Sequence, residues 1–107
     1  ITAIIDTGAE YSVINSKIEA QIGGFTIRPF IVVHSDGQRE KTRLVSFSLL
    51  KDDRYLQVYA AVSKKIHEPL ILGQDFLQMY EAYIEMKRDK IAFNMYAPKY
   101  PRSLGRI

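Results

Sequence analysis

An acidic residue followed by a hydroxyl and a glycine forms the most chemically informative string of this chain. Asp6, Thr7 and Gly8 follow the apolar residues 3–5, so the carboxyl group is expected at a strand end. Two carboxyl groups that share a proton can direct water at a peptide bond: the ionised one takes a proton from water, and the protonated one donates to the carbonyl. Both roles need acids that lie close together and face inward. Proximity of the two charges would keep one acid protonated.

The residues beside Asp6 fit a joint between two copies. Gly8 allows a tight turn and a close approach of the backbone to its counterpart. The Thr7 hydroxyl can donate and accept, so it could bond to the backbone of a partner. The alternative interpretation is structural, because Asp-Xaa-Gly is also common in turns, where the side chain of Asp6 would form an Asx-type turn.

A second string lies more than sixty residues later, at Pro69–Leu77. It is an apolar run that ends at Gly73 and continues into a short helical pattern. Ile71, Leu72 and Phe76 are at least as well explained by core packing as by substrate contact, because apolar residues at such a junction are ordinarily buried. Asp75 is expected to cap or charge the first turn of the helix.

The elements that must position these strings are mostly strands. Patterns rich in β-branched and aromatic residues are found at Thr2–Ile5, Thr26–His34, Thr42–Leu50, Tyr55–Val62 and Tyr83–Asn94. Helical spacing is weak at Ser16–Gln21 and better at Gln74–Tyr80. Turn residues at 23–24, 35–37, 51–53 and 88–89 each join two apolar runs and predict hairpins.

Composition limits the classes that remain. A chain of 107 residues fits one domain, expected at residues 1–96, with a Pro-containing basic tail at 97–107. The absence of cysteine excludes disulfides and thiol catalysis. His34 and His67 stand alone, so no metal site is predicted. No apolar run approaches the roughly 20 residues that cross a bilayer, so no membrane association is expected.

The two strings together resemble the signatures of retropepsin-like aspartic proteases. The resemblance rests on Asp6-Thr7-Gly8-Ala9 with Ser12-Val13-Ile14, and on Ile71-Leu72-Gly73 with Asp75-Phe76-Leu77. It extends over nearly the whole chain. The segments Pro29–Gly37 and Leu77–Glu81 look most like polyprotein proteases of plant pararetroviruses of the caulimovirus, badnavirus and tungrovirus type, or of related LTR retrotransposons.

The resemblance implies an all-β fold, a closed retropepsin-like β-barrel with one short C-terminal helix. It further implies a homodimeric endopeptidase that cleaves a viral or retroelement polyprotein, in the host cell cytoplasm or the virus particle, and without a cofactor. Asp6 would then be catalytic, with Thr7 and Gly8 shaping the site. Ala9 and Ile71 would contact the peptide.

In that family a β-hairpin flap closes over the bound peptide. The resemblance places it at the substrate-binding residues Val33, His34, Ser35, Asp36 and Gly37, and the turn chemistry of this segment also predicts a hairpin. This tip is more polar and has fewer glycines than the best-known retroviral flaps. Glu10 stands where the family more often has Asp, and it is not expected to be catalytic.

Two other functions remain open from the sequence. The fold could serve as a peptide-binding or dimerisation module with little activity, because one aspartate without a partner cannot act as both acid and base. A nucleic-acid-binding β-domain is the third possibility and a minor one. It is suggested by basic residues that accumulate late in the chain: Lys87, Arg88, Lys90, Lys99, Arg102 and Arg106.

Overall fold

A six-stranded sheet forms the body of the molecule. The structure is a computed structural model that describes residues 2–51, 53–80, 83–87 and 90–94. Along the chain the elements are β1 (Ala3–Ile5), β2 (Ser12–Asn15), α1 (Ser16–Ile22), β3 (Phe25–Val33), β4 (Arg39–Lys51), β5 (Arg54–Ser63), β6 (Leu70–Leu72), α2 (Gln74–Met79), β7 (Tyr83–Lys87) and β8 (Lys90–Asn94). The mostly β fold expected from the sequence is confirmed.

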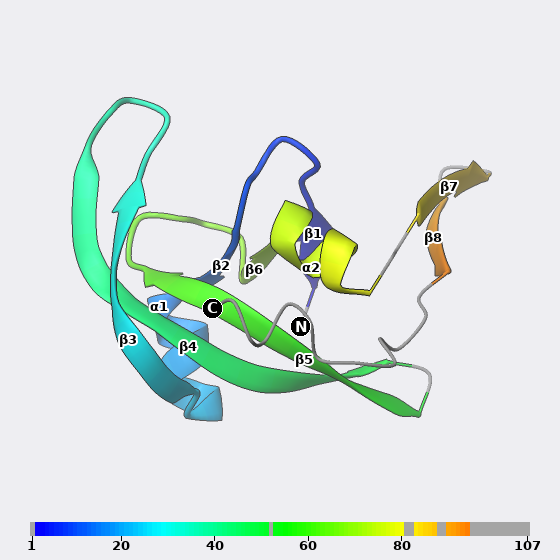
Figure 1. The fold of residues 1–107 in the computed structure, drawn as a ribbon, viewed down its shortest axis with the longest axis horizontal. Coiled ribbons are helices and arrows are strands. Elements are labelled where there is room, and N and C mark those ends of the chain that lie inside the picture. Colours follow the sequence, from blue (N-terminus) through cyan, green and yellow to red (C-terminus); the bar gives the residue numbers. More distant parts are fainter. Residues whose placement is uncertain (1, 52, 81–82, 88–89, 95–107) are drawn as a thin grey trace.

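The order of the strands is β1-β6-β2-β5-β4-β3, so β6 lies between the two strands that flank Asp6. It pairs in parallel with β1 and antiparallel with β2, while β2 pairs in parallel with β5. The long strands β3, β4 and β5 form an antiparallel meander that curls around one side of the molecule (Figure 1). The expected closed barrel is not confirmed, because hydrogen bonding among the described residues does not close this sheet.

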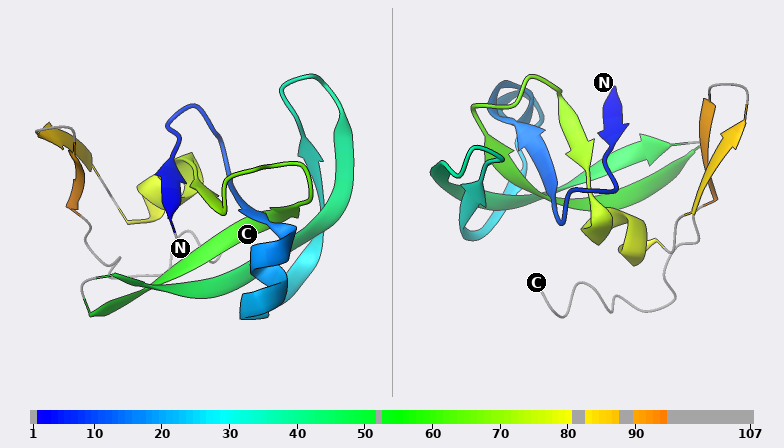
Figure 2. Two further views of the ribbon diagram at one scale, coloured as in Figure 1. Left: turned by 180° about the vertical axis from the view of Figure 1, so that it is seen from behind. Right: turned by 90° about the horizontal axis from the view of Figure 1, so that it is seen from above.

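The core forms where the alternating faces of the strands meet α2. Leu56, Val58 and Ala60 alternate along β5 and are buried, as a period of two predicts for a strand with one covered face. From α2, Phe76 and Leu77 pack into the same cluster. The second view of Figure 2 shows α2 beside the short strands β1, β2 and β6. The expectation that Leu72 and Phe76 belong to the core is confirmed.

The described residues include two short helices: α2, the C-terminal helix that the resemblance implied, and α1, where the sequence showed only weak helical spacing. The weaker pattern forms α1 because the Asn15 side chain accepts from Lys17 N at 2.9 Å, and Gly23 ends the helix at φ 65°. The prediction of a hairpin at residues 23–24 is therefore wrong. Gly23 is the C-cap of α1, and the chain passes from there into β3.

Two of the other predicted turns are confirmed. Residues 34–38 join β3 to β4, and Asp53, in the left-handed region at φ 63°, lies in the connection from β4 to β5. Strands β7 and β8 pair with each other, as the hairpin expected at Tyr83–Asn94 requires. The turn residues 88–89 themselves and the predicted tail at 97–107 lie outside the described residues. No described helix has the length and apolar character needed to cross a membrane.

Candidate active site

Asp6 lies in an exposed loop, residues 6–11, that we call the Asp6 loop. Strand β1 ends just before it, and Asp6 N donates to Leu72 O of β6 at 3.0 Å. The loop turns back at once, since Ala9 N donates to Asp6 O at 3.1 Å and Gly8 N donates to Asp6 Oδ1 at 2.9 Å. The Asx turn of the structural alternative is thus present. A carboxylate has further lone pairs, so this turn is compatible with catalysis.

The start of α2 holds the far side of the Asp6 loop. The first N–H groups of a helix lack partners within the helix, and here two of them donate to the loop. Gln74 N donates to Ala9 O at 2.8 Å, and Asp75 N donates to Glu10 O at 3.2 Å. The Gln74 side chain reaches Thr7 O at 2.6 Å. The predicted catalytic residues therefore sit on a loop whose backbone is fixed by the second sequence string.

Gly73 makes this close approach possible. A Cβ placed on Gly73 would lie 2.7 Å from Tyr11 O and 2.8 Å from Ala9 O. The φ of Gly73 is −100°, which other residues adopt easily, so glycine is required here for space and not for backbone conformation. This gives a physical reason for the glycine that the sequence singled out.

A polar pair, buried Ser12 and half-buried Asp75, completes the junction. Ser12 has no exposed surface, and its hydroxyl donates to Asp75 Oδ1 at 2.7 Å while accepting from Gly73 N at 3.0 Å. Ser12 N also donates to Asp75 Oδ2 at 3.1 Å. Asp75 does serve the first turn of α2, since it accepts from Phe76 N, but its principal role is this connection to β2. Sequence reasoning missed the pair, although a serine within an apolar string was a usable signal.

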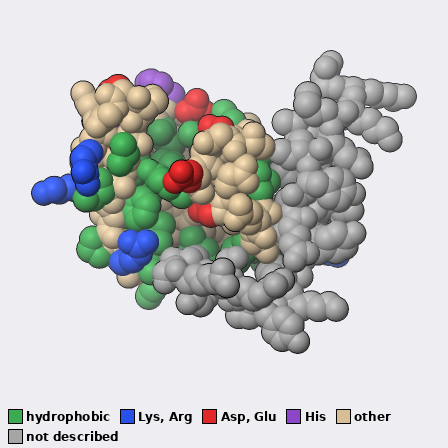
Figure 3. Space-filling model, turned by 45° about the horizontal axis from the view of Figure 1, so that its top comes forward, with side chains coloured by type: hydrophobic (Ala, Val, Ile, Leu, Met, Phe, Trp, Pro, Cys, Tyr) green, Lys and Arg blue, Asp and Glu red, His purple; other side chains and the backbone are tan. Residues whose placement is uncertain are grey.

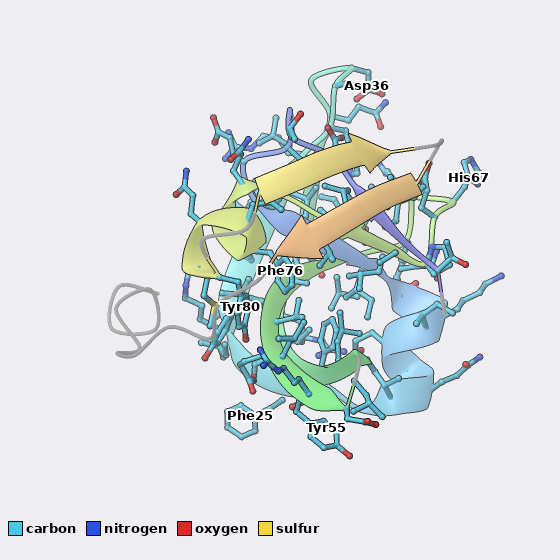
Figure 4. The ribbon with its side chains drawn as sticks, turned by 90° about the vertical axis from the view of Figure 1, so that its right-hand side faces the viewer. Phe25, Asp36, Tyr55, His67, Phe76 and Tyr80 are labelled. Carbon is cyan, nitrogen blue, oxygen red and sulfur yellow. The ribbon has the colours of Figure 1, made fainter. Side chains whose placement is uncertain are left out.

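The predicted substrate-binding residues 33–37 form the tip of the β3–β4 hairpin. His34 N donates to Gln38 O and Gly37 N donates to His34 O, both at 2.8 Å, with Gly37 at φ 84°. This is a three-residue hairpin loop with a glycine in the left-handed region, a common arrangement. Val33, Ser35, Asp36 and Gly37 are exposed and His34 is half-buried. Figure 4 shows Asp36 at the outer end of the hairpin.

A carboxylate that sequence reasoning missed secures the base of this tip. Glu40 on β4 accepts from Ser63 Oγ at 2.7 Å and Lys64 N at 2.8 Å, and it lies 2.9 Å from His34 Nε2. Burial raises the pKa of the Glu40 carboxyl, but the hydrogen bonds from Lys64, Ser63 and His34 outweigh this and hold the pKa below 4.5. Glu40 thereby ties the hairpin to the segment after β5.

The structure places the predicted catalytic residues next to β6 and the start of α2. Asp6, Thr7, Gly8 and Ala9 share a loop that is bonded to Leu72 and Gln74, and Ile71 of β6 pairs with Ile4 and Val13. The hairpin tip lies on the same side of the molecule as the Asp6 loop (Figures 1 and 2).

Carboxylate and apolar side chains gather on that side. In Figure 3, which brings the top of Figure 1 forward, acidic side chains lie among hydrophobic ones. Within the described ranges, no group of three or more potential ligands could hold a metal ion.

Comparison with solved structures defines the class of fold. The EIAV protease complexed with the inhibitor HBY-793 is 23% identical and superposes with a TM-score of 0.58, over 71% of this chain and 72% of that chain. The retroviral protease-like domain of Ddi1 from Leishmania major is 20% identical, with a TM-score of 0.60, over 86% of this chain and 77% of that chain. The chain therefore has a retropepsin-like fold.

Sequence comparison adds nothing to this structural result. No protein-family model matches the chain, and no curated protein sequence matches it. At identities of this size, similarity of structure establishes the fold alone, so function has to be argued from the site.

Proposed function

We propose that this chain is an aspartic endopeptidase that becomes active when two copies pair and bring their Asp6 side chains together. The observation that carries the proposal is the exposed Asp6, presented by a loop that the Gly73–Asp75 segment holds from behind. The Asp6 carboxyl group is thus exposed on a loop that backbone hydrogen bonds hold in place, within a fold similar to that of a retroviral protease. A single exposed carboxylate needs a partner for acid and base chemistry, and a two-fold axis through this loop supplies one.

In the paired form the chemistry follows from the environment of the two carboxyl groups. One Asp6 is ionised and takes a proton from water, and the other is protonated and donates to the carbonyl of the peptide. Gly8 N, which already donates to Asp6 Oδ1, fixes the orientation of each carboxyl group. The firm attachment of the loop to α2 would keep both groups in place during reaction, which is how preorganisation contributes to catalysis.

The substrate in this proposal is an extended peptide from the polyprotein that contains the protease. Its source would be a plant pararetrovirus or a related retrotransposon, and it would act in the host cytoplasm or in the virus particle. The resemblance of Pro29–Gly37 and Leu77–Glu81 to those proteases supports this origin. The hairpin residues 33–37 and Ile71 would contact the peptide, and no metal or cofactor takes part.

The test is cleavage of a polyprotein-derived peptide at mildly acidic pH, over a hundredfold range of enzyme concentration. We expect a rate that rises faster than linearly with concentration and is lost in Asp6→Asn, which keeps the shape of the side chain. Asp53→Asn is the matched control, because Asp53 is exposed in the β4–β5 connection and asparagine tolerates its positive φ.

A mixing experiment tests whether both acids are needed. When wild-type and Asp6→Asn chains are mixed at constant total concentration, activity should fall as the square of the wild-type fraction, because only dimers with two Asp6 groups react. A linear decline would mean that one chain acts alone. A folded wild-type chain that binds the peptide without cleaving it would favour the binding module instead.

A further inference from the structure

Tyr11 connects the Asp6 loop to the β3–β4 hairpin across 22 positions of sequence. Its hydroxyl oxygen accepts from Val33 N at 3.2 Å. Its ring also meets Phe30 edge-to-face, with centroids 5.0 Å apart and planes at 76°. Neither contact was expected from the sequence, where Tyr11 stood only as a neighbour of the acidic motif.

The loop end of this connection is firmly held. The backbone carbonyl of Tyr11 lies against Gly73, and the residue before it accepts from Asp75 N. Ser12, the residue after it, is fully buried and bonded to Asp75. Tyr11 therefore projects from fixed backbone, so a hairpin that moves away from the Asp6 loop must give up its contacts with the Tyr11 side chain.

The hairpin end lies on an open strand edge. β3 is the last strand of the sheet, so its outward N–H groups lack a strand partner among the described residues. Val33 is exposed and belongs to the predicted substrate-binding tip. Phe30, three residues earlier, also has the Arg28 guanidinium over its ring, 5.2 Å from the ring centroid. Tyr11 thus contacts β3 at two points, through a hydrogen bond at Val33 and a ring contact at Phe30.

We infer that Tyr11 is a positioning residue that sets where the hairpin stands relative to Asp6. This inference rests on the proposed function, because it gives the cleft of that peptidase a defined width in the absence of substrate. A hairpin already placed near its working position loses less conformational freedom when a peptide binds. Loss of the tether would therefore weaken peptide binding more than it slows the chemical step, which depends on the Asp6 loop.

The first test needs no substrate. Amide hydrogen exchange, followed by NMR, should show Val33 N–H exchanging about fivefold faster in Tyr11→Phe, the effect of losing one hydrogen bond of ordinary strength. The amide of His34, which donates to Gln38 O within the hairpin, should change little. Tyr55→Phe is the matched control, because Tyr55 is 76% exposed at the far end of the meander. Unchanged exchange at Val33 would overturn the inference.

The second test separates positioning from simple packing. With the peptide substrate, Tyr11→Phe should raise KM several-fold with a much smaller change in kcat, and Tyr11→Leu, which also removes the contact with Phe30, should raise KM further. A fall in kcat at constant KM would overturn the positioning role. An inactive wild-type chain would count against the proposed function alone, since exchange at Val33 is measured without substrate.

Discussion

The two halves of the candidate site are held in different ways. At the junction of the Asp6 loop with α2, backbone groups bond directly to backbone groups, and Ser12, Gly73 and the neighbouring core are buried. The outer part of the β3–β4 hairpin, beyond the pairing of β4 with β5, is instead attached through the side chains of Tyr11 and Glu40, and most of its tip is exposed. In the proposed peptidase, this difference would separate a part that must not move during chemistry from a part that can adapt to a peptide.

The largest expected difference between the two halves comes from adding one methyl group to a glycine in each and comparing the loss of stability. Gly73→Ala puts a Cβ within 2.8 Å of two backbone carbonyl oxygens that cannot rotate away, so the junction must open. We expect a loss of about 3 kcal/mol or more in the free energy of unfolding, at the upper end of the cost of overpacking. Urea denaturation followed by circular dichroism would measure it.

Gly37→Ala is the counterpart in the hairpin. Apart from its two chain neighbours, nothing lies within 4 Å of its Cβ position, so only the positive φ of 84° opposes the substitution. The expected cost is about 1 kcal/mol, that of a left-handed conformation in an L-residue. Equal costs at the two glycines would contradict the view that the junction is the more rigid half.

Two buried serines allow a second comparison, with a smaller effect. Ser12→Ala should cost about 2 kcal/mol, because it leaves the buried Gly73 N–H without an acceptor and removes a donor to Asp75. Ser63→Ala removes a donor to Glu40 and an acceptor of Lys65 N. Since Lys65 is exposed, water can replace that bond, and we expect about half the loss. Thermal unfolding of the two variants at the same pH would rank them.

The smallest expected effect is a pH dependence of the attachment through Glu40. The pKa of its carboxyl is lowered on folding, so the unfolded chain binds protons more readily and acid favours unfolding. The stabilisation is complete above the ordinary value of 4.5 and is lost as the pH falls through the lowered pKa. Glu40→Gln should therefore be less stable than wild type at neutral pH, and the gap should narrow in acid.

Unfolding curves of both proteins between pH 7 and about pH 3 would show this narrowing, because the lower limit lies below the ordinary titration range of a carboxyl group. The protection factor of the Lys64 amide, which donates to Glu40, should fall over the same interval when each rate is compared with that of an unprotected amide at the same pH. A gap that stays constant with pH would mean that the shape of the side chain matters and its charge does not.

The sequence predicted features that depend on nearby residues. The tip at residues 34–38 follows from local turn chemistry, and the helix at Gln74–Met79 follows from spacing after Gly73. The role of Gly23 was misjudged, because a glycine pair can join two strands or end a helix equally well. The closed barrel came from resemblance, and the hydrogen bonding of the described strands does not support closure.

The polar contacts of the site could not be predicted from the sequence for a different reason. Ser12 and Asp75 are 63 positions apart, and Glu40 and Lys64 are 24 apart. No periodicity encodes which distant side chains will meet, since that depends on the strand order. Asp6 and Gly73 could be singled out because each belongs to a recognisable string, whereas Tyr11 and Glu40 acquire their roles only in three dimensions.

The position of β6 between β1 and β2 has a consequence for the order in which parts of the molecule fold. Strands on either side of Asp6 cannot take their final places until a segment more than sixty residues downstream arrives between them. Contacts this distant in sequence form late and slowly in folding. In a chain whose residues 70–75 have not yet been synthesised, the Asp6 loop therefore lacks the hydrogen bonds that hold it. We expect the candidate site to be among the last parts of the molecule to form.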